Sequence, residues 1–465
     1  MRAGVIRDIR VSESIIEAGL IQVSPQISWV RKVRNIALLV VFTAFAAVLS
    51  CAYIHSKQLN GPPIRSDGFG YYAYLPAVFI DHNLGLASAL NNIPAGVSSY
   101  ELGINPLKDT GRYFDKYAVG TAVMQSPFFL AAHVFAGLFG QPQTGYSRFY
   151  QVANSLSAIA YLCIGMFFLY RALRANHSSV IALATVALTV FATNVFHYAT
   201  YDASFSHIYQ FALTSILIYL LIGGQSINGQ LPWKWTVSVG LITGLITLTR
   251  LTNAPIALLP AVFFLGRLRE SGDIKSFFFD ASLAACCALL ILFPQLMYWK
   301  HMTGHWFVNA YAMVGEDAKF YWSHPALVDY LFSIRKGALF WSPLLILALV
   351  GFPSLTRRQP MLGWTAAIVL MLHIYICSSW YYWSFGGSFG SRPMVDVMPL
   401  FALPLAMTVD RLAKRYTVPM LACAAAALIL LNLTLMYSYW YRFIPFDQTD
   451  IATLLRLPGR LWAGQ

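Results

Sequence analysis

The chain has 465 residues, of which 58% are hydrophobic and only 11% are charged. Because soluble domains carry roughly 25% charged residues, this composition excludes an ordinary water-soluble globular protein and indicates a membrane protein. The formal net charge of +13 does not indicate nucleic-acid binding, because the lysines and arginines are spread over short loops between apolar segments.

About eleven apolar segments are long enough, or nearly so, to cross a hydrocarbon core of roughly 30 Å as α-helices. A helix satisfies its backbone hydrogen bonds internally, as lipid requires, and the alternating pattern of a transmembrane barrel is absent. The sequence therefore predicts an all-α, polytopic membrane protein. The expected spans are residues 36–54, 148–170, 180–197, 205–222, 236–249, 252–266, 277–298, 337–354, 363–378, 396–410 and 419–438.

The loops on one side of these spans are short and dense in lysine and arginine. The positive-inside rule places that side, and with it residues 1–35, in the cytoplasm. Residues 12–22 could form a short amphipathic helix on the membrane surface. A transmembrane domain is expected over 36–438, and with an odd number of spans a short external tail follows over 439–465.

The first external loop, 55–147, is long and contains an apolar stretch at 119–139. We expect this stretch to lie along the membrane, because counting it as a span would move the basic loop with Arg171 and Arg174 to the outside. The loop would then carry helices that lie on the membrane surface.

Asp67 lies in this loop, just after the first span, in the run Ser66–Tyr72 of glycines and aromatics. A carboxylate held at a bilayer boundary is costly, so it is a functional candidate by default. It could act as a general base that faces a cavity, or it could cap a helix or pair with Arg65. Gly68 and Gly70 would allow a ligand to approach closely.

Three basic side chains are candidates for binding a phosphate. Lys116 opens the apolar stretch of the first loop, where it could contact a phosphate or extend toward the membrane interface. Arg250 lies between two spans with almost no loop, so it needs a lipid phosphate or an acidic partner. Arg392 lies in an external segment rich in glycines and aromatics, which is typical of a wall over a pocket.

The remaining candidates have equally plain structural explanations. Asp202 could be a second acid in the same cavity or a helix cap, and His207 could contact substrate or be a structural histidine. Tyr71 and Tyr72 could line a sugar site or anchor the chain at the interface. Trp383 could stack on a sugar ring, although an aromatic belt explains it nearly as well.

The P-loop, GxGxxG, HExxH and GxSxG motifs are absent, and the six cysteines form no CxxC pair. The sequence therefore requires no cofactor. Two aspartates could bind a divalent metal, but no set of metal ligands with a recognisable spacing is visible.

The order of these features resembles the GT-C superfamily of membrane glycosyltransferases, the group that contains protein O-mannosyltransferases and the lipid A aminoarabinose transferase. In those enzymes a first span leads into an external loop with a catalytic acid near its start, followed by surface-lying helices. Asp67 in the run Ser66–Tyr72 matches that acid. The run Tyr113–Lys116, with its apolar helix and Arg148, is similar to the aminoarabinose-transferase pattern Tyr-Phe-Glu-Lys-Pro-Pro, although the proline pair is absent.

Asp202 corresponds by position to a second acid after the third span of that family. Segments 331–343 and 383–392 look like those of a bacterial subgroup, and the resemblance extends over residues 36–410. It implies that a sugar is transferred, with inversion, from a polyprenyl-phosphate donor to a hydroxyl of a glycan, lipid or protein on the periplasmic side of the bacterial inner membrane.

Within that chemistry Asp67 would be the base, and Lys116, Arg250 and Arg392 would neutralise the released lipid phosphate. The expected partners are the lipid donor, the acceptor and membrane lipids, and no nucleic acid. Two other functions remain open. A transporter or flippase of lipid-linked sugars would share the spans, and an O-antigen ligase would use a late external loop with the residues His301, His305, His324, Arg335 and Lys336.

Overall fold

The computed structural model describes residues 25–94, 96–107, 110–224, 231–313 and 318–463, so the amphipathic helix expected at 12–22 lies outside the described residues. Among these described residues, seven helical segments are long and apolar enough to cross a membrane. They lie in α2 (Pro25–Ser56), α5 (Gly120–Leu138), α6 (Arg148–Leu173), η1 with α11 (Leu251–Ala257 and Leu258–Ser271), α12 (Ile274–Thr303), α17 (Pro360–Ser379) and α19 (Val418–Trp440).

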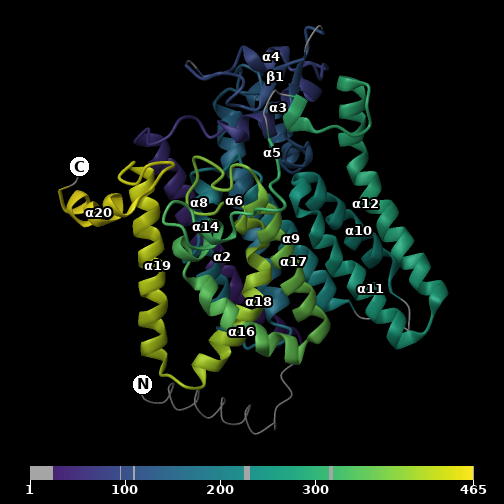
Figure 1. Ribbon diagram of the computed structural model, residues 1–465, viewed down its shortest axis with the longest axis vertical. Helices are drawn as coiled ribbons and strands as arrows, with labels where there is room; N and C mark the ends of the chain where they lie inside the picture. The colour runs from purple at the N-terminus through teal and green to yellow at the C-terminus, as the bar shows by residue number, and fades with distance from the viewer. Residues whose placement is uncertain (1–24, 95, 108–109, 225–230, 314–317, 464–465) are drawn as a thin grey trace, which may run out of the picture.

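Five further helices complete the bundle (Figure 1). They are α7 (Ser179–Phe191), α9 (His207–Gly223), α10 (Trp233–Thr249), α16 (Leu344–Arg358) and α18 (Met394–Ala413). The all-α, multi-pass membrane class predicted from the sequence is therefore confirmed, whereas the number of spans stays a prediction. So does the surface position of residues 119–139, because α5 also has the length and composition of a span.

Helices α9 and α18 form the centre of the bundle, where they pack against each other. Helix α18 is buried along most of its length, from Met394 to Thr408. It also packs closely on α16, because a Cβ atom at Gly351 would lie only 1.8 Å from the carbonyl oxygen of Pro404. Only glycine allows the two backbones to approach to this distance.

Two predicted spans are interrupted, one by a contact with a distant segment and one by a proline. The span expected at 180–197 ends at Phe191, and a short helix α8 (Val195–Thr200) follows. Between them the side-chain amide of Asn194 donates to the carbonyls of Phe389 (3.2 Å) and Ser391 (3.1 Å). The span expected at 337–354 is divided into α15 (Ala338–Trp341) and α16 by Pro343, which cannot donate a backbone hydrogen bond.

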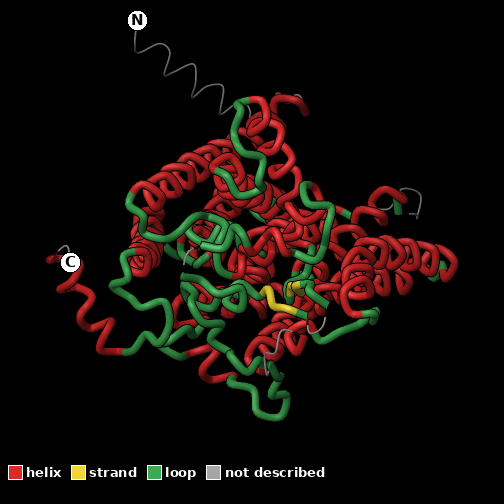
Figure 2. Tube along the Cα trace, turned by 90° about the horizontal axis from the view of Figure 1, so that it is seen from above, coloured by secondary structure: helices red, strands yellow, loops and turns green. Residues whose placement is uncertain are grey.

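The first external loop folds into a second, smaller core at one end of the bundle (Figure 1). It contains α3 (Asp67–Phe79), α4 (Ala87–Leu90) and a hairpin of two antiparallel strands, β1 (Ile104–Pro106) and β2 (Tyr113–Asp115), in which Ile104 lies opposite Asp115. Figure 2 shows these strands among the loops at that end. The remaining short helices are α13 (Ala310–Met313), α14 (Leu327–Phe332) and α20 (Ile451–Ala463).

Candidate active site

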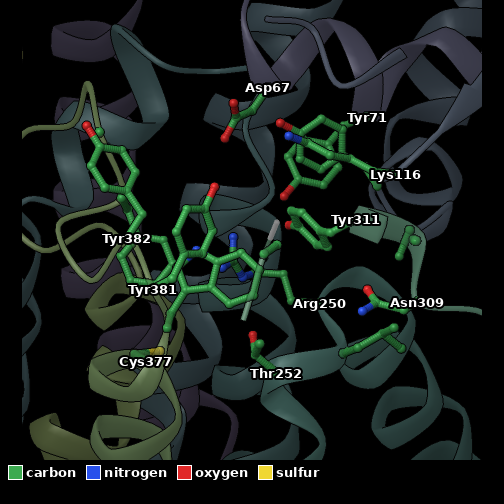
Figure 3. Close-up of a pocket in the computed structure, with 18 of the residues that line it drawn as sticks. Asp67, Tyr71, Lys116, Arg250, Thr252, Asn309, Tyr311, Cys377, Tyr381 and Tyr382 are labelled. Carbon is green, nitrogen blue, oxygen red and sulfur yellow. The ribbon is translucent and has the colours of Figure 1, made fainter. Parts of the chain in front are cut away.

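A cavity of about 560 Å³ lies where the first external loop meets the ends of the bundle helices. Its wall combines the start of α3, the start of η1, the end of α12 and the segment after α17. Five of the nine candidate side chains line it, namely Asp67, Tyr71, Lys116, Arg250 and Arg392. Figure 3 shows Asp67, Lys116 and Arg250 around a common space.

Asp67 is the first residue of α3, and its side chain retains 20% of its exposure. Oδ2 lies 2.8 Å from Nη2 of Arg392, and the Tyr117 hydroxyl donates to the carboxylate. Burial alone would raise the pKa of Asp67, but Arg392, Lys116 and the Tyr117 hydrogen bond hold it below its usual range. Asp67 is therefore ionised at neutral pH.

Gly68 and Gly70 in α3 allow other side chains of the protein, rather than a ligand, to pack closely on this helix. A Cβ atom at Gly68 would lie 1.8 Å from Oγ of Ser204, and one at Gly70 would lie 2.5 Å from the ring of Tyr117. The close approach that we expected for a ligand is thus made by these side chains. Gly70 allows the Tyr117 ring to lie against the helix, from where its hydroxyl reaches Asp67.

Arg250 lines the cavity at the point where helix α10 ends and the backbone becomes extended. Helix α10 ends at Thr249, and Arg250 is extended, with φ −151° and ψ 114°. Its Nε lies 3.1 Å from Oδ2 of the fully buried Asp396. The acidic partner that the sequence required is therefore present, in α18.

Asp396 is in turn held by two more side chains. His207 Nδ1 lies 2.8 Å from Oδ1, and Asn253 Nδ2 donates to Oδ2 at 2.9 Å. Because an ionised carboxylate only accepts hydrogen bonds, Nδ1 of His207 carries the proton. His207 does not line the cavity, so it contributes by fixing the carboxylate that holds Arg250.

Lys116 and Arg392 also lie among aromatic rings. The Lys116 ammonium is 5.1 Å from the ring centre of Tyr311 and 5.3 Å from that of Tyr117. The Arg392 guanidinium carbon is 5.5 Å from the ring centre of Phe205. Rings at these distances stabilise cations without neutralising them.

The structure does not bring Asp202 to the cavity. Its Oδ1 lies 2.7 Å from Nη2 of Arg65, and its Oδ2 lies 2.9 Å from Nε2 of His197. Trp440 Nε1 then donates to Nδ1 of His197 at 3.0 Å. Arg65 is thus paired with Asp202 and not with Asp67, the partner that the sequence left open.

Two aromatic candidates also lie outside the cavity lining. The Tyr72 hydroxyl donates to the carbonyl of Gly145 at 2.6 Å, and its ring is buried in the second core. The Trp383 ring lies 5.8 Å from the guanidinium carbon of Arg335. The five residues named for an O-antigen ligase do not line the cavity either.

Several residues of this site were not predicted. Tyr117 and Tyr311 line the cavity beside Lys116, and Tyr381 lines it on the opposite side (Figure 3). No role was predicted for Asp396, although a carboxylate in an apolar helix is itself a signal of function. Within the described ranges, no group of three or more His, Cys, Asp or Glu side chains could hold a metal ion.

No protein-family model and no curated protein matches this chain in sequence. Among solved structures, the chain is similar to the archaeal oligosaccharyltransferase AglB from Archaeoglobus fulgidus, in complex with an inhibitory peptide and a dolichol-phosphate, with a TM-score of 0.51 at 11% identity. The match covers 89% of this chain and 56% of AglB, so the chain spans little more than half the length of that protein. The likeness shows the fold alone: the chain shares the multi-pass helical fold of that protein, which agrees with the fold that the resemblance to the GT-C superfamily implied.

Proposed function

We propose that the protein is an inverting glycosyltransferase, which moves a sugar from a polyprenyl-phosphate donor to an acceptor hydroxyl. The observation that carries the proposal is one carboxylate, Asp67, that shares a cavity with three cations, Lys116, Arg250 and Arg392, and is paired with the last of them. A carboxylate can accept a proton, and a cluster of cations fits a phosphate. That AglB was solved with a dolichol-phosphate supports a lipid phosphate as the donor group.

In the proposed reaction the acceptor oxygen attacks the anomeric carbon from the face opposite the phosphate. The bond between that carbon and the phosphate oxygen breaks, its electron pair stays on the phosphate, and the acceptor proton goes to Asp67. Arg250 and Lys116 neutralise the charge that grows on the phosphate. Arg250 suits this role because Asp396 fixes it from the buried side, at 3.1 Å.

Arg392 has two functions in this proposal. Its ion pair with Asp67 keeps the base deprotonated before the acceptor arrives. The lowered pKa also makes Asp67 a weak base, so proton transfer comes late. By then the anomeric carbon is already cationic and the attacking hydroxyl has become acidic.

Asp202 acts in this account as a positioning residue. Its ion pair with Arg65 fixes the chain two residues before Asp67. The ring of Tyr201 lies stacked on Trp440, at 5.7 Å between centres, and so ties this turn to α19. The network thereby holds the start of α3 and the orientation of the proposed base.

Aromatic rings in the wall of the cavity form the proposed sugar site. Tyr311, Trp380 and Tyr381 line it, and the rings of Tyr311 and Trp380 lie 5.0 Å apart. Rings of this kind pack on the apolar faces of sugars, while their hydroxyls bond to sugar oxygens. The donor phosphate would then lie at the cationic side.

We place the protein in the cytoplasmic membrane of a bacterium, with its N-terminus in the cytoplasm and the cavity on the external side. The positive-inside pattern of the loops supports this orientation. The acceptor is a hydroxyl of a glycan, a lipid or a protein, and the charge compensation described above needs no metal ion.

The test is to incubate the purified protein in nanodiscs with a panel of polyprenyl-phosphate sugars and a matching panel of acceptors. We expect free polyprenyl phosphate and a product whose anomeric configuration is opposite to that of the donor. Retention of configuration would contradict the single-displacement mechanism. Movement of the intact lipid across the membrane, without cleavage, would show a transporter instead.

A further inference from the structure

Helix α20, Ile451–Ala463, lies outside the bundle and crosswise to α19 (Figure 1, yellow). Seen from above, it extends away from the edge of the molecule (Figure 2). It follows the span α19 after ten residues, 441–450. Helix α20 therefore lies near the depth in the membrane at which the span α19 ends, on the same side of the molecule as the cavity.

One side of α20 packs on the protein. Leu457 is buried, and Leu454 and Leu461 are partly buried against the same core. Arg460 Nη1 donates to the carbonyl of Phe443 at 2.9 Å. These contacts fix the rotation of the helix about its axis.

With that rotation, large apolar side chains remain uncovered. Ile451 is 61% exposed, Leu455 is 75% exposed and Trp462 is 94% exposed. At 3.6 residues per turn these three positions fall within about 40° of one another, and they adjoin the side that contacts the protein. Arg456 and Arg460 lie on the side of the helix that faces away from these three apolar side chains.

Lipid fits this uncovered face better than a protein partner does. Helix α19, the span that precedes it, has the surface of a lipid-facing helix, with Leu430 62% and Leu431 48% exposed. Helix α20 contains two arginines and no acidic residue, which suits anionic phospholipids, and tryptophan favours the membrane interface.

We infer that α20 is an interfacial membrane anchor on the cavity side of the bilayer. Ile451, Leu455 and Trp462 enter the boundary between the headgroups and the acyl chains, and Arg456 faces the headgroups. The anchor has a direct link to the cavity, because Asp447, four residues before α20, bonds to the cavity residue Tyr382 at 2.6 Å. It therefore fixes the height of the cavity wall above the membrane, whatever reaction the cavity performs.

The experiment uses the full chain with its six cysteines replaced by serine. Single cysteines are introduced by Leu455→Cys, Trp462→Cys and, on the opposite side, Arg456→Cys. Each is labelled with an environment-sensitive fluorophore in nanodiscs of phosphatidylethanolamine and phosphatidylglycerol. We expect labels at 455 and 462 to emit at shorter wavelength and to be quenched by spin-labelled lipid, and the label at 456 to be quenched less.

Water-like emission at all three positions would overturn the anchor. So would short-wavelength emission at 455 and 462 that spin-labelled lipid does not quench, because a protein would then cover the face. If the serine background does not fold, the unmodified chain is cross-linked to lipids that carry a photoreactive acyl chain. Cross-links within 451–463 are expected, and their absence while α19 is labelled would also contradict the inference.

Discussion

Arg392 and Asp67 come from distant parts of the chain, yet Nη2 of the arginine lies 2.8 Å from Oδ2 of the aspartate. The pair joins the first external loop to the segment before α18, at the wall of the cavity. The residue that we propose as the base is thus held in its ionised form by a cation from a distant part of the chain.

Replacing Arg392 by glutamine should move the pH profile of the reaction. Arg392 lowers the pKa of Asp67, so its removal raises that pKa. Because only the ionised carboxylate accepts a proton, the acidic limb of kcat/KM should shift to higher pH, together with a lower maximal rate. An acidic limb that does not move would contradict the electrostatic link between the two residues.

Asp396→Asn should destabilise the protein and weaken donor binding. The substitution leaves Arg250 beside a neutral amide, and breaking a buried pair costs roughly 3–5 kcal/mol. We expect a lower midpoint of thermal unfolding and a higher KM for the donor. The matched control is Asp410→Asn, which breaks an exposed pair with Lys414, worth about 0.3–0.5 kcal/mol. Equal effects of the two substitutions would refute the buried network.

Gly70→Ala should lower activity by displacing Tyr117. The new Cβ atom would lie 2.5 Å from the Tyr117 ring and 2.6 Å from the carbonyl oxygen of Leu102. Tyr117 would then lose its hydrogen bond to Asp67. Gly61→Ala is the control, because its nearest neighbour, Cδ of Arg65, is 3.9 Å away. A kcat that is unaltered by Gly70→Ala would show that Tyr117 does not support the base.

Asp447→Asn should act on substrate binding more than on chemistry. Asp447 accepts bonds from Nε of Arg335 at 2.8 Å and from the Tyr382 hydroxyl at 2.6 Å, and so supports one wall of the cavity. We expect KM to rise by several-fold with a smaller change in kcat, measured by steady-state release of polyprenyl phosphate. A loss confined to kcat would argue against a role in the wall.

Chelation of divalent metals should leave the transfer rate unchanged. Lys116, Arg250 and Arg392 already supply positive charge at the cavity. The assay is run with and without EDTA, and then with added Mg²⁺ or Mn²⁺. Loss of activity in EDTA that either metal restores would require a metal ion in the mechanism.

Individual residues of the candidate site could be predicted where a charged side chain is energetically costly at a membrane boundary. Asp67, Lys116 and Arg250 are charged side chains at the boundaries of apolar segments, and the structure brings all three to one cavity. The partners could not be predicted, because they depend on tertiary packing. Asp67 has Arg65 two residues away in sequence, yet it pairs with Arg392.

In the fold, too, some features follow from the local sequence and others depend on tertiary packing. The break at Arg250 follows from a charge between two apolar runs, and η1 begins immediately after it. The end of α7 at Phe191 depends on Asn194 bonding to residues 389 and 391. No local pattern of hydropathy contains that information.

The most direct test of the central claim measures the rate at which polyprenyl phosphate is released from a saturating donor and acceptor, by wild-type protein and by Asp67→Asn. The asparagine preserves shape and removes basicity, so we predict a rate lower by about 10²- to 10⁴-fold in a protein that unfolds at or near the wild-type temperature. Wild-type release by Asp67→Asn would contradict the assignment of Asp67 as the base.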